Sequence, residues 1–156
     1  LFHLTENRVT QKIWQDFFLA PDDSKPVCSL DPFGQFRKEN IVCARVWSNN
    51  GDLLASCMEP CDIERKIEYP QDTGLKLRTE KGVLILSCRS YARCVELCGD
   101  NNGESFGWLF EDNFFDLLPG EEKRVKVFGD HHCGRITAKA VYDSKIASCE
   151  WKLETQ

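Results

Sequence analysis

Short runs of β-branched, aromatic and other apolar residues, each bounded by turn-forming residues, recur along most of this chain of 156 residues. The bounding segments contain Pro, Gly, Asn and Asp, which favour turns for distinct conformational reasons. Because no helix-period pattern stands between these runs, we predict an antiparallel β-sandwich of the immunoglobulin type. The candidate strands after Pro60 are residues 66–69, 75–79, 83–88, 91–97, 124–128, 135–141 and 148–153.

The clearest local signal is a β-hairpin over residues 41–57. Two β-prone runs, 41–47 and 52–57, flank the sequence Ser48-Asn49-Asn50-Gly51. Asn and Gly both tolerate positive φ, so this pair predicts a type I′ turn between the two strands.

The first third of the chain has no single interpretation. Its apolar residues recur at helical spacing, yet a subset of them would also share one face of a strand. The residues concerned are Val9, Ile13, Trp14, Phe17, Phe18 and Leu19. Because the chain begins at Leu1 without an initiator Met, we expect it to be a piece of a longer protein.

The charge pattern argues against two classes of partner. The chain carries 20 basic and 25 acidic residues, for a net charge of −5, and the two signs are interspersed. This pattern supplies no basic surface for nucleic acid or for an anionic membrane. It also lacks both the run of about 20 apolar residues that a membrane-spanning helix needs and an N-terminal signal core. We therefore expect neither nucleic acid nor a membrane as a partner.

We interpret the nine cysteines as free thiols. Their number is odd, and their spacing does not repeat an extracellular disulfide pattern. Cys88, Cys94 and Cys98 lie at even intervals within expected strands, where a reduced Cys packs as a small apolar residue. With no Asn-x-Ser/Thr sequon in the sequence, this usage favours a reducing, cytoplasmic location over secretion.

Residues 111–125 combine an apolar centre, acidic flanks and a Pro-Gly turn. Pro119 presets φ for the first central position of a type II turn, and Gly120 can take the positive φ that the second requires. We expect a corner between two strands, in which Phe114, Leu117 and Leu118 pack inward and Asp112 or Asn113 binds backbone amides. The corner residues are Asp112, Asn113, Phe114, Phe115, Asp116, Leu117, Leu118, Pro119 and Gly120.

The same run resembles one in the final immunoglobulin-like domain of bacterial-type β-mannosidases of glycoside hydrolase family two. The other pieces occur in matching order: an apolar strand, a segment that in this chain reads Ala-Arg-Cys-Val-Glu-Leu, a variable loop, a charged strand and a closing strand that ends in Asp-Ser. Here these pieces are residues 83–87, 92–97, 99–109, 123–127 and 136–144. The likeness covers about residues 66–144, and the hairpin is similar to the closing strands of the preceding immunoglobulin-like domain.

The resemblance implies two parts and a non-catalytic role. Residues 1–60 would be remnant or partner strands of a preceding immunoglobulin-like domain, and residues 61–156 would form an immunoglobulin-like sandwich. The family's catalytic glutamates lie on a (β/α)₈ barrel, for which this chain has no pattern. The implied role is to pack on the catalytic barrel and other domains of the parent enzyme and to shape its substrate pocket. The alternatives are a carbohydrate-binding module and a stand-alone protein-interaction domain.

A catalytic role for the acidic residues of the corner is weakly supported. Asp112 with Asp116, or Glu111 with Asp116, could flank a sugar as an acid–base pair. Asp and Asn at such positions more often bind neighbouring backbone amides, so we predict no catalytic residue.

A metal site is also weakly supported. His131-His132-Cys133, with Cys57 and Cys61, supplies ligand types that zinc accepts. However, neighbouring residues of a strand point to opposite faces and Cys-x₃-Cys is not a tight zinc knuckle, so we predict neither metal nor cofactor.

Trp and Tyr rings could stack on sugars, although a sandwich core or interface also accounts for them. Trp108, beside a Gly-rich loop, is the Trp expected to be exposed. Together with Phe106 it is the candidate contact for an oligosaccharide or another domain.

Overall fold

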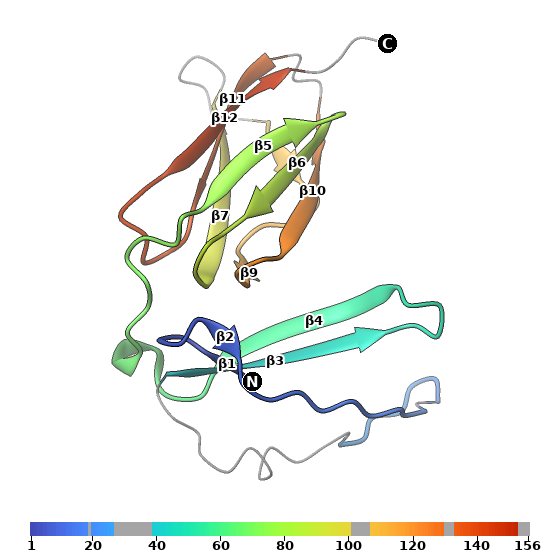
Figure 1. Ribbon diagram of the computed structural model, residues 1–156. Coiled ribbons are helices and arrows are strands. Elements are labelled where there is room, and N and C mark those ends of the chain that lie inside the picture. Colours follow the sequence, from blue (N-terminus) through green and yellow to red (C-terminus); the bar gives the residue numbers. More distant parts are fainter. Residues whose placement is uncertain (19, 27–38, 101–106, 130–132, 153–156) are drawn as a thin grey trace. The chain divides into compact units, whose positions relative to one another are not determined.

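The computed structural model describes residues 1–18, 20–26, 39–100, 107–129 and 133–152. It is all-β, with antiparallel sheets (Figure 1), which confirms the predicted fold class. The helical residues within the described ranges are those of the short 3₁₀ turn η2 (Glu64–Lys66), and no helix there is long and apolar enough to cross a membrane. The chain divides into unit 1, Leu1–Glu68, and unit 2, Tyr69–Gln156. The division after residue 60 into parts of a parent protein stays a prediction.

Unit 1 contains a four-stranded antiparallel sheet with the strand order β2-β1-β3-β4. Phe2 and Ile41, which face each other across β1 and β3, are buried. The predicted hairpin is present as β3 and β4, which pair from Ile41↔Pro60 to Trp47↔Leu53. The strands are β1 (Phe2–His3), β2 (Arg8–Val9), β3 (Asn40–Trp47) and β4 (Leu53–Pro60).

The turn of this hairpin is not the predicted type I′ turn. The N–H of Ser48 donates to the carbonyl of Asp52 at 2.8 Å, and the N–H of Gly51 donates to the carbonyl of Ser48 at 3.0 Å. Gly51 has a φ of 87°, whereas neither Asn49 nor Asn50 has a positive φ. A three-residue loop with a left-handed third position is a type I turn followed by a glycine bulge. Gly51 therefore serves the bulge position instead of the second position of a two-residue turn.

The described aromatic residues between β2 and β3 lie in neither a helix nor a strand. Trp14 is 74% exposed and Phe18 is 78% exposed. The Trp14 ring lies 5.4 Å from that of Trp47 at the tip end of β3. Of the residues with this ambiguous periodicity, Val9 lies in the short strand β2, whereas the described residues that follow it form neither a helix nor a strand.

Unit 2 is a β-sandwich of two four-stranded antiparallel sheets, with strand orders β5-β6-β10-β8 and β12-β11-β7-β9 (Figure 1). This arrangement corresponds to the two sheets of a constant-type immunoglobulin domain, with one added short strand. The strands are β5 (Lys76–Glu80), β6 (Val83–Ser87), β7 (Ala92–Asp100), β8 (Leu109–Phe110), β9 (Phe115–Leu117), β10 (Glu122–Phe128), β11 (Cys133–Lys139) and β12 (Ala147–Lys152).

The strand predicted over residues 66–69 is absent, because Lys66 ends η2 and residues 67–69 do not pair with a neighbouring strand. In the described part of unit 2, two strands were missed: β8 and β9, with two and three residues, are too short to show an alternating pattern. The apolar run of residues 83–86 lies in β6, which is a central strand between β5 and β10.

The core of unit 2 lies between its two sheets. Buried and exposed residues alternate along β7, β10 and β11, as expected for a sandwich with one wet face on each sheet, whereas Leu84, Ile85 and Leu86 of β6 are all buried. Trp151 is the largest of the buried side chains and is 2% exposed. Other fully buried members are Leu84, Leu86, Val95, Val125, Ile136 and Ala138.

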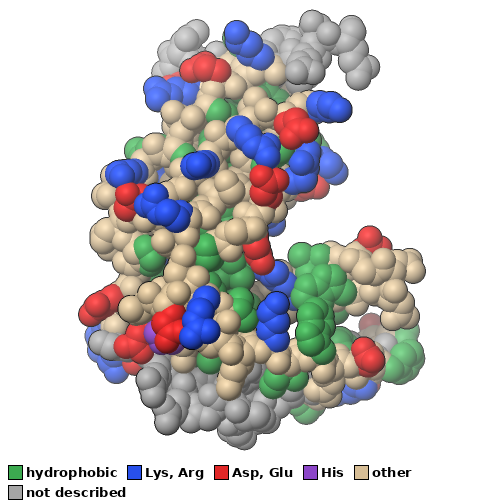
Figure 2. All heavy atoms as spheres, in the orientation of Figure 1, with side chains coloured by type: hydrophobic (Ala, Val, Ile, Leu, Met, Phe, Trp, Pro, Cys, Tyr) green, Lys and Arg blue, Asp and Glu red, His purple; other side chains and the backbone are tan. Residues whose placement is uncertain are grey.

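The outer face of the β5–β6–β10 sheet is charged. Figure 2 shows basic and acidic side chains interspersed over unit 2. Arg78 of β5 bonds Glu122 of β10 at 2.8 Å across the intervening β6. Such mixed, exposed charges indicate a solvated surface and not a binding site.

Candidate functional site

A β-bulge in β7 sets the geometry of the corner. The pairing of β7 with β9 shifts register between Ala92 and Val95, and Cys94 has a φ of 48°. An extra residue reverses which side chains face the core. From Val95 onward the buried positions are therefore Val95, Leu97 and Gly99, whereas Cys98 is exposed.

Because of the bulge, the prediction that Cys88, Cys94 and Cys98 all pack in the core is only partly right. Cys88 is buried as expected, but Cys94 is only half-buried and Cys98 is exposed. All eight cysteines in the described ranges are free thiols, and Cys28 lies outside those ranges. Burial raises the pKa of the Cys88 thiol to about 12, so this thiol stays protonated at neutral pH.

The carboxylate of Asp116 holds the bulge in place. One of its oxygens accepts the N–H of Cys94 at 2.7 Å. The other accepts the hydroxyl of Tyr91 and the guanidinium of Arg93, each at 2.6 Å. Burial, and then the charge of Asp116, raises the pKa of Tyr91, so Tyr91 remains a hydrogen-bond donor. The Asp116 side chain is 9% exposed, so it has little surface left with which to contact a ligand.

Asn113 acts as a substitute for a strand residue. Its Oδ1 accepts the N–H of Leu97 at 2.7 Å, and its Nδ2 donates to the carbonyl of Leu97 at 3.1 Å. Of the two residues expected to bind backbone amides, Asn113 does so. Asp112 instead pairs with the Nζ of Lys123 at 2.5 Å, and that ammonium lies 5.1 Å from the centre of the Phe115 ring.

The end of the corner contains the expected turn. Gly120 has a φ of 78°, and the N–H of Glu121 donates to the carbonyl of Leu118 at 3.3 Å, which closes a type II turn before β10. Leu117 and Leu118 are buried. Phe114, however, is 61% exposed, so the prediction that it packs into the sandwich is wrong. Its φ of 59° interrupts the strand alternation directly before β9.

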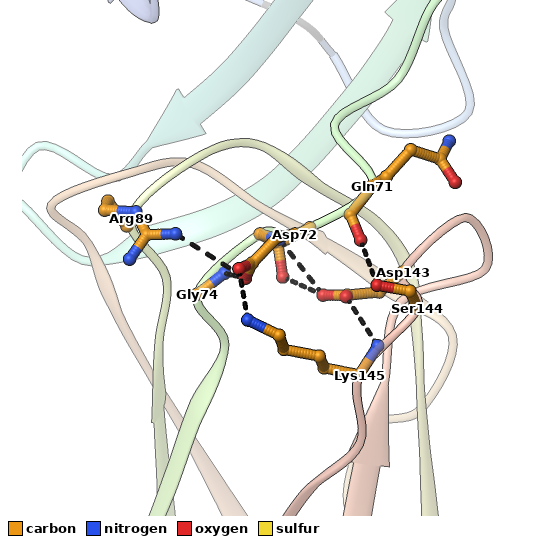
Figure 3. A network of polar contacts seen from close by, with 8 residues as sticks. Gln71, Asp72, Gly74, Arg89, Asp143, Ser144 and Lys145 are labelled. Carbon is orange, nitrogen blue, oxygen red and sulfur yellow. Dashed lines mark hydrogen bonds and ion pairs between the residues drawn. The ribbon is translucent and has the colours of Figure 1, made fainter.

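A second polar network lies in the loops that precede β5 and β12 (Figure 3). The carboxylate of Asp143, 5% exposed, accepts the hydroxyl and the N–H of Thr73 and the N–H of Lys145. The carbonyl of Thr73 in turn accepts the N–H groups of Arg89 and Ser90, at 2.9 and 3.0 Å. Three loops are thereby joined through two buried polar residues.

An exposed set of contacts surrounds this network (Figure 3). Ser144 donates both its N–H and its hydroxyl to the carbonyl of Gln71, at 2.9 and 2.8 Å. Asp72 accepts the Nζ of Lys145 and lies 3.5 Å from the guanidinium of Arg89. The hydrogen bond from Lys145 lowers the pKa of Asp72, which therefore stays ionised.

A stack of three tyrosines connects the two networks. The rings of Tyr69 and Tyr142 are parallel within 4° and 4.7 Å apart, and those of Tyr69 and Tyr91 are 6.1 Å apart. Since Tyr91 also bonds Asp116, contacts run without a break from the corner to the loop that holds Asp143. The candidate site is thus one end of the sandwich.

Trp108 is not the exposed ring that we predicted. It is half-buried against the core, and its ring meets that of Trp151 edge-on at 6.4 Å. A Cβ atom added at Gly99 or Gly134 would lie within 2.2 or 2.6 Å of the indole, so these glycines provide the space for it. Phe106 lies outside the described residues.

No metal-binding group is found among the residues that the structure describes: no three His, Cys, Asp or Glu side chains there are placed to share an ion. His131 and His132 lie outside the described ranges, and Cys133 is exposed at the start of β11.

The sequence predicted no role for Thr73, Arg93 or Asp143. Turn-forming residues surround Thr73, and Asp143 lies four residues after the end of β11. The signal that was missing is the pairing, because the N–H of Thr73 and the carboxylate of Asp143 are 70 residues apart in the sequence.

Comparison with known families places this end of the sandwich within a recognised domain. Residues 70–144 match the family model Ig_mannosidase, described as an Ig-fold domain. No match was found among curated proteins or among solved structures. The matched range lies within unit 2 and includes both polar networks except for Lys145.

Proposed function

We propose that this chain is a non-catalytic accessory portion of a β-mannosidase-like glycoside hydrolase. Residues 70–144 form an Ig-fold domain of the type found in β-mannosidases, and such a domain is typical of the non-catalytic part of these hydrolases. In this role unit 2 packs on the catalytic barrel and neighbouring domains of the parent enzyme and helps to shape the substrate pocket.

The observation that carries the proposal is that the corner carboxylates are engaged within the domain. Glycoside hydrolysis needs one carboxyl group that donates a proton and a second that acts on the opposite face of the sugar. Asp116 is enclosed by three donors, and Asp112 pairs with Lys123. A backbone hydrogen bond from Lys126 lowers the pKa of Glu111, which disfavours the protonated form that an acid catalyst requires.

The aromatic residues of unit 2 favour packing over sugar binding. Sugar-binding modules present flat, accessible rings, but Trp151, Tyr91 and Tyr69 are buried. Trp108 is covered on the sheet side by Gly99 and Gly134. A carbohydrate-binding module is therefore the weaker of the proposals.

Two assays on the purified chain test whether it hydrolyses a glycoside or binds a sugar. We expect no turnover of an aryl β-mannoside, and no heat of binding with mannose or a manno-oligosaccharide in titration calorimetry. Turnover that is lost in Asp112→Asn, a substitution far too mild to unfold the chain, would contradict the proposal. Saturable oligosaccharide binding would favour the carbohydrate-binding module instead.

A third experiment tests the accessory role directly. A β-mannosidase of glycoside hydrolase family two is truncated before its own terminal immunoglobulin-like domain, and that excised domain is first shown to rebind. The 156-residue chain is then added in its place. We expect measurable association by calorimetry or sedimentation, and a chain that fails to bind where the excised domain succeeds would overturn the proposal.

A further inference from the structure

The tip of the β3–β4 hairpin holds an exposed Asn-Gly pair. Asn49, Asn50 and Gly51 are all exposed to solvent. Within the described ranges, no residue bonds to the side-chain amide of Asn50, although its backbone N–H donates to the hydroxyl of Ser48 at 3.2 Å. In Asn113, by contrast, both polar atoms of the amide bond the backbone of another strand. The amide of Asn50 is therefore free to rotate toward the backbone that follows it.

The backbone nitrogen of Gly51 is the group that can attack this amide. Because glycine has no Cβ, no side chain shields the nitrogen, and an added Cβ here would meet no atom within 4 Å. Gly51 also has a φ of 87°, which a residue with a side chain rarely adopts. The hairpin turn thus requires a glycine at the same position at which the reaction favours one.

One backbone hydrogen bond opposes the attack. The N–H of Gly51 donates to the carbonyl of Ser48 at 3.0 Å, and this bond must open before the nitrogen can approach Cγ of Asn50. Local opening at an exposed loop tip costs far less free energy than the unfolding of a core. We therefore expect the fold to slow the reaction relative to a short peptide of the same sequence, without stopping it.

We propose that Asn50 is a self-modification site, which converts to aspartate and isoaspartate without an enzyme. The nitrogen of Gly51 forms a bond to Cγ of Asn50, and the proton that it loses leaves with the side-chain amide group as ammonia. Water then opens the resulting cyclic imide. Opening at Cγ gives aspartate, and opening at the backbone carbonyl gives isoaspartate, in which the chain runs through the former side chain. No group is oxidised or reduced.

The products change the hairpin tip in two ways. Both add a negative charge close to Asp52, whose carboxylate accepts the hydroxyl of Ser48 at 3.3 Å. Isoaspartate also lengthens the backbone of the loop by a carbon atom. The loop length sets the turn, which the N–H of Ser48 closes by donating to the carbonyl of Asp52 at 2.8 Å. Isoaspartate should therefore open the end of the hairpin, where Trp47 pairs with Leu53.

Asn49 provides a matched control within the same loop. It is also exposed, but the residue after it has a side chain, which shields the backbone nitrogen that would attack. Asn50→Gln is a second control, because its longer side chain would have to close a larger and less favourable ring. Another Asn-Gly pair, Asn102-Gly103, lies outside the described residues, so the modified residue must be identified by peptide mapping.

The experiment incubates the folded 156-residue chain at neutral pH and maps its peptides by mass spectrometry at intervals. We expect Asn50 to convert about tenfold or more faster than Asn49, a ratio that corresponds to about 1.4 kcal/mol between the two barriers. Both aspartate and isoaspartate should appear, and Asn50→Gln should yield neither at this position. Equal rates at Asn49 and Asn50, the absence of conversion at Asn50, or aspartate without isoaspartate would overturn the proposal.

Hydrogen exchange at the hairpin tip tests the structural consequence. The isoaspartate form, separated by chromatography, should exchange faster around Ser48 and Leu53 than freshly prepared Asn50→Asp. Both forms carry the added charge, but only isoaspartate lengthens the backbone. Equal exchange in the two would show that the modification does not open the hairpin, which would overturn this part of the inference.

Discussion

Replacing Asp116 by Asn removes one negative charge from the centre of the corner while keeping the size of the side chain. The amide oxygen of Asn can still accept the N–H of Cys94, which now bonds the carboxylate at 2.7 Å. The amide nitrogen would then face the guanidinium of Arg93, which can only donate, and the hydroxyl of Tyr91, which can also accept. The bond to Arg93 is therefore lost, and the bond to Tyr91 is at best replaced by one between two neutral groups.

The expected loss of stability follows from these contacts. Hydrogen bonds to a charged group contribute roughly 1.5–3 kcal/mol each, and the limited exposure of this ion pair reduces solvent screening. Some relaxation of Arg93 toward water will recover part of the loss. We expect Asp116→Asn to lower the free energy of unfolding of unit 2 by about 3 kcal/mol, which a domain of ordinary stability survives.

Native-state hydrogen exchange, read by mass spectrometry on peptides from β6, β10 and β11, measures the stability of unit 2 separately from that of unit 1. Asp112→Asn is the control, because its partner Lys123 is more exposed and such ion pairs contribute about 1 kcal/mol or less. If Asp116→Asn costs no more than Asp112→Asn, the carboxylate does not hold the bulge and the reasoning is refuted.

Three further predictions concern the same unit. Leu118→Ala should lower its unfolding free energy by about 2–5 kcal/mol in a denaturant melt, because the Leu118 side chain is buried, and an unchanged midpoint would contradict this. Gly120→Val should destabilise through backbone strain alone, by roughly 1–2 kcal/mol, since φ is 78° but an added Cβ meets no atom within 4 Å; Gly120→Asn should cost less, and equal melts for the two would argue against it. The folded pKa of Cys88 is raised to about 12 from 9.0, so its stabilising contribution is full below pH 9 and is lost as pH rises toward 12; Cys88→Ala should flatten the alkaline stability curve, and alkylation of the native protein should label exposed Cys98 before Cys88.

The sequence by itself determined the features that depend on neighbouring residues. Alternating apolar runs between turn signals specify short strands, and the order of those runs specified a sandwich. Pro119-Gly120 specified a type II turn because both residues act through their own φ preferences. The hairpin over residues 41–57 was predictable for the same reason. Its turn type was not predictable, because a loop of three residues needs a left-handed residue at a different position from a loop of two.

The tertiary structure decided the features that depend on residues far apart in the chain. The bulge at Cys94 is held by the carboxylate of Asp116, which is 22 residues away in the sequence. The extra residue in the bulge reverses which side chains of the rest of β7 face the core. Cys98 therefore points to solvent. Trp108 is packed because Gly99 and Gly134, on two neighbouring strands, leave space for its ring. A periodic sequence pattern depends on residues that are close together in the chain. The bulge, the space for Trp108 and the exposure of Phe114 depend on contacts between strands that are far apart in the chain.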